Sequence, residues 1–246
     1  MYPTITLFGH DLATYTINLV FSILGAVIIY MFYAKTFKFT AKERLVIILP
    51  TAVSFVIASK LLFFAEAGRF HWGGSGFSLF GTIFVFPIIM IPISLLIKKN
   101  YFHVSASVIP ILALALGQAK IGCFLAGCCY GLRASWGLPD LFNPEVLRLP
   151  VQLFEAGSCF LIALICFLIN HRRKYAEFTA PLFYLLYGLC RFALEYMRDN
   201  LKPFFSMSQA QIYCLTIILL SLCMIIFMNK QQIRSSSKKA TVKGEI

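Results

Sequence analysis

Seven long apolar stretches follow one another along the chain, separated by short segments that hold most of its charged residues. The stretches cover residues 13–34, 46–66, 78–97, 104–126, 151–170, 179–197 and 209–229. A helix needs about 20 predominantly apolar residues to cross a bilayer, and most of these stretches reach that length. The pattern predicts an all-α polytopic membrane protein with about seven transmembrane helices.

The fourth stretch and the loop that follows it are unusually rich in glycine. Gly117 and Gly122 lie within the stretch, and Gly127 and Gly131 follow it. Glycine weakens a helix but lets a second backbone or a ligand approach closely. We therefore expect this span and the loop after it to be the least regular part of the chain.

The basic residues fall unequally on the two sides that these spans define. One side holds fourteen of them: Lys35, Lys38, Lys42, Arg44, Lys98, Lys99, Arg172, Arg173, Lys174, Lys230, Arg234, Lys238, Lys239 and Lys243. The other side holds five: Arg69, Arg133, Arg148, Arg198 and Lys202. Because Lys and Arg concentrate in cytoplasmic loops, we expect the N terminus outside and the C terminus in the cytoplasm. Residues 1–229 then form one transmembrane domain, and residues 230–246 a basic cytoplasmic tail.

The composition agrees with a membrane protein. Of the 246 residues, 59% are hydrophobic and 13% charged, the mean hydropathy is +0.81 and the formal net charge is +12. A basic balance can indicate a nucleic-acid partner, but here most basic residues fall in the loops between apolar spans. That placement favours contact with a lipid surface, and we expect no nucleic-acid partner. Residues 1–12 carry no basic segment before the first apolar stretch, so no cleavable signal peptide is expected.

A polar stripe interrupts the sixth apolar stretch. Tyr187, Arg191, Glu195 and Arg198 follow one another at spacings of four, four and three residues. On a helix they fall within about 80° of one another. Since a charge at membrane depth costs about 2.5–3.5 kcal/mol on insertion scales, the stripe should face a protein interior or a water-filled cavity. Two interpretations remain open: an Arg–Glu pair that only locks helices together, and a site for the phosphate of a lipid headgroup.

Lys60, Lys120 and Glu155 are further charged residues within apolar stretches. A buried Glu155 needs a cationic partner, and Lys120, Arg191 and Arg198 are the candidates. The alternative is a carboxylate exposed to water at the membrane interface. Lys60, Lys120, Arg191 and Arg198 outnumber Glu155 and Glu195 by two, and an anionic ligand would balance that excess.

The chain has eight cysteines, of which Cys123, Cys128 and Cys129 lie close together in sequence. They could form a metal or redox site, or they could simply pack. Adjacent cysteines do not match the usual zinc spacing, and no histidine is nearby. The sequence therefore favours packing, and no metal site is predicted.

Four short segments stand out as motifs. Ala119–Gly131 reads AKIGCFLAGCCYG, Arg148–Glu155 reads RLPVQLFE, Tyr187–Arg198 reads YGLCRFALEYMR, and Ser206–Gln209 reads SMSQ. In this order they resemble the motifs of the bacterial prolipoprotein diacylglyceryl transferases. The third matches the pattern Y-G-x-x-R-[FI]-x-x-E-x-x-R at every named position. Tyr15 lies where that family has a tyrosine in its first span, so the resemblance covers most of the chain.

The resemblance implies an enzyme of the bacterial cytoplasmic (inner) membrane that uses phosphatidylglycerol and prolipoproteins. Such enzymes transfer the diacylglyceryl group of phosphatidylglycerol to the thiol of a lipobox cysteine, forming a thioether and releasing glycerol phosphate. The resemblance implies no cofactor and no metal. The matching positions imply catalytic roles for Tyr187, Arg191, Glu195 and Lys120. They imply substrate-binding roles for Arg198, Glu155, Gln152, Tyr15 and Lys60.

The chain also departs from the family pattern. Phe80 stands where the family has the histidine of a His-Gly-Gly motif. Lys120 replaces the arginine of the glycine-rich signature, which keeps the charge but loses the bidentate fork. Cys123 and Cys128 replace its usual asparagine and acidic residue, and Lys60 replaces an arginine often found in span two. These departures leave a second hypothesis, a catalytically divergent paralogue that binds phospholipid headgroups without the transfer.

Overall fold

The computed structural model describes residues 4–7, 10–68, 76–141, 143–199 and 207–244. Seven α-helices follow the order of the seven apolar stretches. They are α1 (Thr14–Tyr33), α2 (Ala41–Ala67), α3 (Leu79–Leu96), α4 (Tyr101–Leu125), α5 (Val151–His171), α6 (Thr179–Glu195) and α7 (Gln209–Gly244). Two short 3₁₀ helices, η1 (Ala34–Phe37) and η2 (Arg173–Phe178), lie in the connections. Arg69 and Lys202, which were counted for the orientation, and Ser206 of the fourth motif lie outside the described residues.

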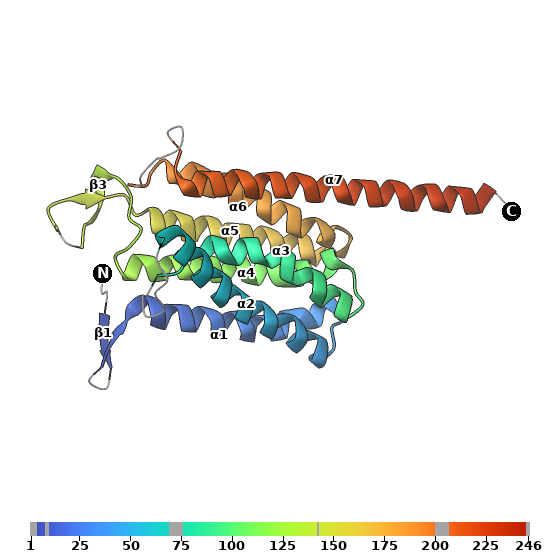
Figure 1. The fold of residues 1–246 in the computed structure, drawn as a ribbon, viewed down its shortest axis with the longest axis horizontal. Helices are drawn as coiled ribbons and strands as arrows, with labels where there is room; N and C mark the ends of the chain where they lie inside the picture. The colour runs from blue at the N-terminus through green and yellow to red at the C-terminus, as the bar shows by residue number, and fades with distance from the viewer. Residues whose placement is uncertain (1–3, 8–9, 69–75, 142, 200–206, 245–246) are drawn as a thin grey trace.

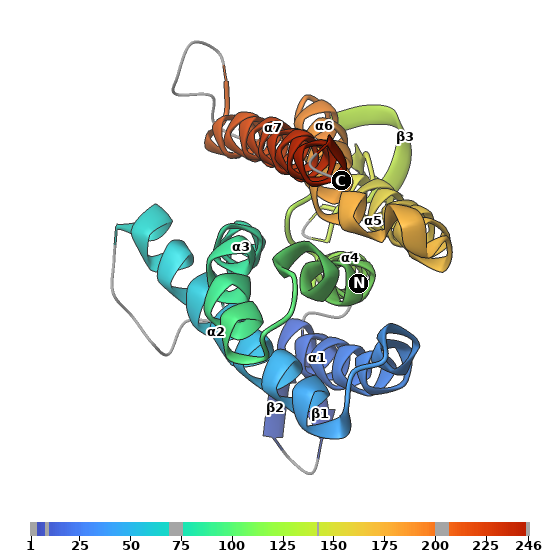
Figure 2. The same cartoon turned by 90° about the vertical axis from the view of Figure 1, so that its right-hand side faces the viewer.

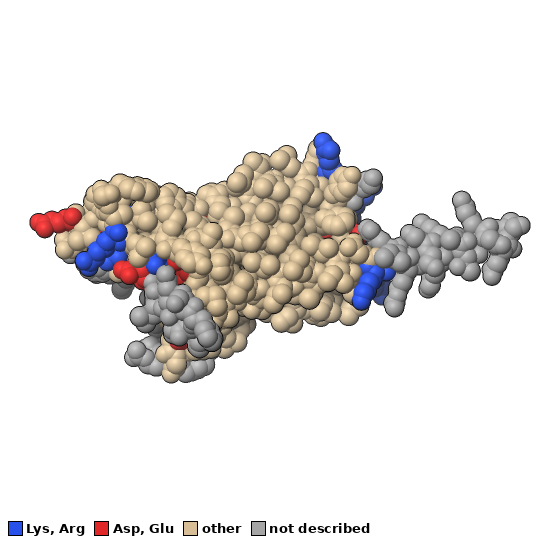
Figure 3. All heavy atoms as spheres, turned by 90° about the horizontal axis from the view of Figure 1, so that it is seen from above, with Lys and Arg blue, Asp and Glu red and all other residues tan. Residues whose placement is uncertain are grey.

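Six of the described helices are long and apolar enough to cross a membrane, namely α1, α2, α3, α4, α5 and α7. Helix α6 is shorter, with 17 residues, and carries Arg191 and Glu195. Charged side chains on the face seen in Figure 3 gather toward the two ends of the long axis, and the surface between them is tan, the colour of uncharged residues. The protein is therefore a multi-pass membrane protein. The seventh crossing and the orientation stay predictions.

Helix α4 occupies the middle of the bundle and packs against α1, α3, α5 and α6 (Figures 1 and 2). Its glycines allow this close packing. A Cβ atom on Gly122 would lie 2.3 Å from Nδ2 of Asn18 on α1, and one on Gly117 would lie 2.6 Å from the ring of Phe160 on α5. The helix runs without interruption to Leu125, so the expectation of an irregular fourth span was wrong. Backbone hydrogen bonds inside a protein or membrane meet no competing water, and this offsets the weak helix propensity of glycine.

Two short antiparallel strand pairs, absent from the all-α prediction, lie at one end of the bundle (Figure 1). Strand β1 (Thr4–Leu7) pairs with β2 (His10–Ala13) just before α1. Strand β3 (Arg133–Pro139) pairs with β4 (Leu147–Arg148) in the loop between α4 and α5. This end of the bundle is where the motif segments meet.

The last helix extends well beyond the others, to Gly244 (Figure 1). The expected boundary between the transmembrane domain and a basic tail at residues 229 and 230 is therefore not marked by a change in secondary structure. The division rests on charge alone and stays a prediction.

Candidate functional site

A cavity of about 490 Å³ lies at the end of the bundle that carries the strand pairs. The ends of α1, α2, α3, α4, α6 and α7 contribute to its wall, and we call it the charged cavity. The side chains that give it its chemistry are Tyr15, Glu66, Ser78, Phe80, Lys120, Cys123, Cys129, Tyr187, Arg191, Glu195, Arg198, Asp199, Ser208 and Tyr213. Three motif segments meet here, from α4, from α6 and from the start of α7.

Glu155 of α5 lies directly beside this wall and binds three cations. Its Oε1 atom lies 2.8 Å from Nζ of Lys120 and 3.0 Å from Nε of Arg191, and its Oε2 atom accepts a hydrogen bond of 2.9 Å from Nη2 of Arg198. Only 1% of Glu155 is exposed. The expectation that Glu155 needs a cationic partner is confirmed, and all three candidates are used. The alternative of a water-exposed carboxylate was wrong.

Glu195 is the second buried carboxylate of this group. It pairs with Arg191 one helical turn earlier, and its Oε1 atom accepts a hydrogen bond of 2.7 Å from Oγ of Ser208. The backbone N–H of Ser208 donates to Oε1 of Gln211, and the backbone N–H of Gln211 donates to Oγ of Ser208. This reciprocal pair has the pattern of a capping box, which fixes the first turn of α7. The start of α7 thereby holds Glu195 in place.

The buried charged cluster carries one net positive charge, since Lys120, Arg191 and Arg198 face Glu155 and Glu195. The four cations predicted to be buried are all at most 7% exposed. The predicted excess of two buried cations over Glu155 and Glu195 is confirmed, but Lys60 lies elsewhere, so the excess within this cluster is one. Of the cluster's described atoms, Nε of Arg198 is buried and has no hydrogen-bond partner, lying 4.0 Å from Oε2 of Glu195. The cluster therefore has a positive charge and a donor left for a ligand.

The motif segments are also joined through their backbones. Gly131 and Arg198 form an isolated β-bridge, and the N–H of Leu132 donates to the carbonyl of Met197 at 2.9 Å. The N–H of Gly131 donates to the carbonyl of Leu149 at 3.1 Å. These bonds place the end of the glycine-rich motif between the motif Arg148–Glu155 and the motif Tyr187–Arg198.

Arg148 stabilises the loop between α4 and α5, which lies next to the charged cluster. Its guanidinium pairs with Asp140 and, at 3.0 Å, with Asp199, and it lies 4.2 Å from the centre of the Tyr130 ring. Partial burial alone would lower the pKa of Arg148, but the hydrogen bonds to Asp199 and Asp140 outweigh it and raise that pKa. Arg148 therefore neutralises Asp199 at the cavity wall and stays charged.

An aromatic wall faces the arginines. The centre of the Phe80 ring lies 5.6 Å from the guanidinium carbon of Arg191, a cation–π distance. Phe80 meets Tyr187 and Tyr213 edge to face, at centroid distances of 6.5 and 5.1 Å. The position that carries a histidine in the family pattern thus lies on the charged cavity, beside Arg191.

The remaining predicted site residues lie at different distances from this centre. Tyr15 lines the charged cavity and contacts Phe77, with ring centroids 6.1 Å apart. Lys60 does not line it: its ammonium lies over the Phe77 ring at 4.8 Å and 3.3 Å from the carbonyl of Gly76. Gln152 is also away from it and donates to the carbonyl of Cys128 at 2.8 Å. The structure brings together all the predicted residues except Lys60 and Gln152.

Sequence reasoning missed several residues of the wall. Glu66 at the end of α2 accepts a hydrogen bond of 3.0 Å from Oγ of Ser78, and both line the charged cavity, as does Tyr213. The argument that singled out Glu155, a carboxylate near the end of an apolar stretch, applies equally to Glu66. Ser208 belongs to the fourth motif, but nothing in the sequence pairs it with Glu195.

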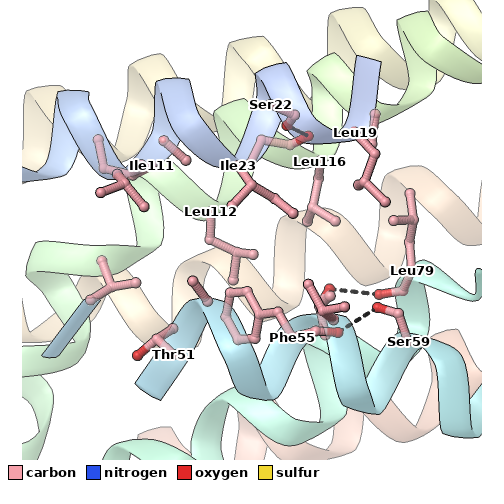
Figure 4. Close-up of a pocket in the computed structure, with 18 of the residues that line it drawn as sticks. Leu19, Ser22, Ile23, Thr51, Phe55, Ser59, Leu79, Ile111, Leu112 and Leu116 are labelled. Carbon is pink, nitrogen blue, oxygen red and sulfur yellow. Dashed lines mark hydrogen bonds between the residues drawn. The ribbon is translucent and has the colours of Figure 1, made fainter. Parts of the chain in front are cut away.

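A second cavity, of about 90 Å³, adjoins the first and is apolar. Side chains from α1, α2 and α4 converge on it in Figure 4, including Ile23, Phe55 and Leu112. Phe77 and Leu79 line both cavities. A charged compartment and an apolar compartment therefore share a wall, as an amphipathic ligand requires.

Comparison with known proteins gives one family. The family model described as prolipoprotein diacylglyceryl transferase matches residues 3–227. The phosphatidylglycerol–prolipoprotein diacylglyceryl transferase 2 of Clostridium perfringens is 27% identical over 165 residues, which are 61% of this chain and 64% of that protein. The transferase of Clostridium tetani is 30% identical over 52% of this chain and 53% of its own length. That of Dehalococcoides mccartyi is 29% identical over 78% of each. The chain thus spans less than two thirds of the length of the two clostridial relatives.

Proposed function

Because the chain belongs to the prolipoprotein diacylglyceryl transferase family, we propose that it transfers the diacylglyceryl group of phosphatidylglycerol to the lipobox cysteine of prolipoproteins. The product is a thioether, and glycerol phosphate is released. The relatives named above carry phosphatidylglycerol and prolipoprotein in their names, and the family model matches residues 3–227 of this chain.

The observation that carries the proposal is the convergence of Lys120, Arg191 and Arg198 on one cavity, with one net positive charge. A phosphodiester carries one negative charge, so phosphatidylglycerol would neutralise the cluster. Charge-assisted hydrogen bonds from arginine to phosphate are among the strongest in proteins. Nε of Arg198, which is buried and has no hydrogen-bond partner, would become a donor for such a bond when the side chain turns toward the phosphate. The shared wall at Phe77 and Leu79 would give the first carbons of an acyl chain an apolar surface to contact while the phosphate stays with the cations.

The transfer requires one bond to form and one to break. The sulfur of the lipobox cysteine attacks the diacylglyceryl carbon bonded to the phosphate oxygen. The C–S bond forms, and the C–O bond breaks with its electron pair on the leaving phosphate. Arg191 and Arg198 would stabilise the charge that develops there, and Lys120 would add to it. The thiol proton passes to the Glu195 carboxylate or to water, while the Tyr187 hydroxyl would only orient the acceptor, and a cationic surround favours the thiolate that attacks.

The roles of the other predicted residues follow from their positions. Glu155 would hold the three cations at fixed positions before the substrate binds, and Tyr15 would contact the substrate from α1. Lys60 would act through Phe77, and Gln152 by fixing the turn after α4. All these assignments belong to the proposal.

We also propose the membrane placement that the charges indicate. Seven helices cross the cytoplasmic membrane, the N terminus and the charged cavity face outward, and the basic residues after residue 229 form a cytoplasmic tail. Lipobox segments reach the outer face of that membrane, so the cavity would meet both substrates there. This placement is supported by the fourteen-to-five distribution of basic residues.

The second candidate function is phospholipid binding without transfer. The observation that favours it is Phe80, which places an aromatic ring beside Arg191 where the family pattern has a proton-carrying histidine. The two functions differ in one respect: both require phosphatidylglycerol to bind, but only the first modifies a peptide.

The experiment uses purified protein in liposomes that contain phosphatidylglycerol, mixed with a peptide that carries a lipobox cysteine. Transfer is read as the mass gain of the peptide, and binding as phosphatidylglycerol co-purified with the protein. Arg191→Ala and Arg191→Lys should lower transfer by about 100-fold or more, the cost of removing a charge-stabilising donor. Arg133→Ala, which changes an exposed arginine of β3, is the matched control and should retain activity.

The outcomes separate the two functions. Lipid binding without a mass gain for the wild type supports the paralogue. Full transfer by a correctly inserted Arg191→Ala variant contradicts the site assignment.

A further inference from the structure

Three thiols lie together where α4 ends. The Sγ atoms of Cys123, Cys128 and Cys129 all lie within 4.8 Å of one another. Cys123 is buried, Cys128 is half-buried and Cys129 is exposed. Cys123 and Cys129 line the charged cavity, but the proposed transfer does not use them.

The end of α4 explains how this spacing brings the first two thiols together. Gly127 has a φ of +69°, the left-handed conformation that ends many helices. Its N–H donates to the carbonyl of Phe124 at 3.1 Å, and the N–H of Cys128 donates to the carbonyl of Cys123 at 3.0 Å. This is the hydrogen-bond pattern of a Schellman motif, which turns the chain back over the last helical turn. Cys128 therefore lies against Cys123 although four residues separate them.

The third thiol joins through a second left-handed residue. Cys129 has a φ of +60°, a conformation that costs a residue with a Cβ atom about 1–2 kcal/mol. The turn is fixed from α5, because Gln152, which is 1% exposed, donates to the carbonyl of Cys128 at 2.8 Å. The three thiols are therefore arranged by the fold rather than by chance contact of flexible side chains.

We propose that Cys123, Cys128 and Cys129 form a binding site for a thiophilic d¹⁰ divalent cation, with a fourth coordination position facing the charged cavity. Thiolate is the ligand that such soft cations prefer. A zinc–sulfur bond of about 2.3 Å in tetrahedral geometry places two sulfurs about 3.8 Å apart. Thiols already within 4.8 Å need to approach by about 1 Å at most.

The surrounding charges fit this occupant. Three thiolates and one divalent cation carry one net negative charge, and Lys120 and Arg198 line the same cavity. The cluster is also the one group of three or more potential metal ligands found within the described residues. Adjacent cysteines do not match the usual spacing of zinc ligands. Here Cys128 and Cys129 can both reach the metal, because Cys129 adopts the left-handed conformation.

The test uses the full chain, purified in detergent under reducing conditions, with Cd²⁺ as the probe. We expect one Cd²⁺ bound per chain and a new ultraviolet absorption from charge transfer between thiolate and metal. Cys129→Ser and the triple variant Cys123→Ser/Cys128→Ser/Cys129→Ser should lose both signals. Cys223→Ser is the matched control, since Cys223 is also an exposed thiol, on α7, and it should bind Cd²⁺ as the wild type does.

A second measurement needs no variant and so does not depend on refolding. Cd²⁺ should slow alkylation of Cys129 in the wild type by about tenfold or more, because a metal-bound thiolate is a poor nucleophile, whereas Mg²⁺, which prefers oxygen ligands, should leave the rate unchanged. Absence of Cd²⁺ binding, binding that survives the triple variant, or equal effects of Cd²⁺ and Mg²⁺ on Cys129 would each overturn the proposal.

Discussion

Glu155→Gln is the substitution that most directly tests how the charged cluster is held together. The amide keeps the size of the side chain but removes the charge that Lys120, Arg191 and Arg198 share. The net charge of the cluster rises from one to two, and three close charge–charge contacts are lost. Because none of these groups is more than 7% exposed, water in the charged cavity replaces only part of the interaction with the lost carboxylate.

The magnitude follows from the distances. At an effective dielectric constant of about 20, a charge pair separated by 2.8–3.0 Å gains roughly 6 kcal/mol before desolvation is counted. Desolvation offsets most of this gain, and removal of one partner from a buried pair typically costs 3–5 kcal/mol. Since three cations lose their partner at once, we expect Glu155→Gln to lower the free energy of unfolding by about 5 kcal/mol, the upper end of that range.

The assay is unfolding of the purified protein by a denaturing detergent in mixed micelles, for the wild type, Glu155→Gln, Lys120→Gln and the double variant. Lys120→Gln restores the net charge of the cluster in the Glu155→Gln background, so the double variant should cost at least about 1 kcal/mol less than the sum of the singles. Glu66→Gln is the control, because Glu66 is exposed at the same cavity and should cost about 1 kcal/mol or less. Additivity within about 0.5 kcal/mol, or equal losses for Glu155→Gln and Glu66→Gln, would refute the reasoning.

Three other predictions concern packing, capping and thiol reactivity. Gly122→Ala should destabilise the protein by about 1–3 kcal/mol, because the new Cβ atom would collide with α1. Gly157→Ala is the control: its Cβ atom meets no atom within 4 Å, so the substitution should be neutral or stabilising. Detergent unfolding that ranks the two variants the other way would contradict the close packing of α4. Ser208→Ala should cost about 1–2 kcal/mol, since it removes the hydrogen bond to Glu195 and a cap of α7, and an unchanged unfolding midpoint would show that the bond is not formed. Hydrogen bonds from its neighbouring thiols lower the pKa of Cys129 well below the ordinary value, so its thiolate persists as the pH falls. Its alkylation, followed by mass spectrometry, should change little between about pH 7.5 and 6.5, where free cysteine with a pKa of about 8.5 slows about tenfold, and a matching tenfold loss at Cys129 would contradict the shift.

The order and position of the helices were predictable from the sequence because the length and polarity of a transmembrane stretch are local properties. The face shared by Tyr187, Arg191 and Glu195 was predictable for the same reason, since helical spacing alone puts these residues on one side of α6. Arg198 was wrongly placed on the same helix: α6 ends at Glu195, and Arg198 reaches the charged cavity from a β-bridge with Gly131.

The partners across helices were not predictable in the same way. The sequence required a cation for Glu155 but left three candidates open, and only the packing of α4, α5 and α6 brings all three to one carboxylate. Lys60 was grouped with them because it too is a cation in an apolar stretch, yet α2 directs it to Phe77. Gln152 lies three residues before Glu155, almost one helical turn nearer the start of α5, and there it donates to the turn after α4 instead.

The thiol cluster was also not predictable from the sequence. Spacing rules for zinc sites assume ligands in ordinary turns, and the pair Cys128 and Cys129 falls outside them. The positive φ of Cys129 is a tertiary feature, held by Gln152 of α5, and nothing in the local sequence of the turn indicates it.

The measurement that tests the central claim most directly is the stoichiometry of transfer by the wild-type protein. Lipobox peptide and phosphatidylglycerol are incubated with the protein in liposomes, and the diacylglyceryl peptide and free glycerol phosphate are counted by mass spectrometry in the same sample. The account predicts that the two products form in equal amounts, at the cations around Glu155, and only when phosphatidylglycerol is present. Phosphatidylglycerol that binds while neither product forms, or glycerol phosphate released without a modified peptide, would contradict it.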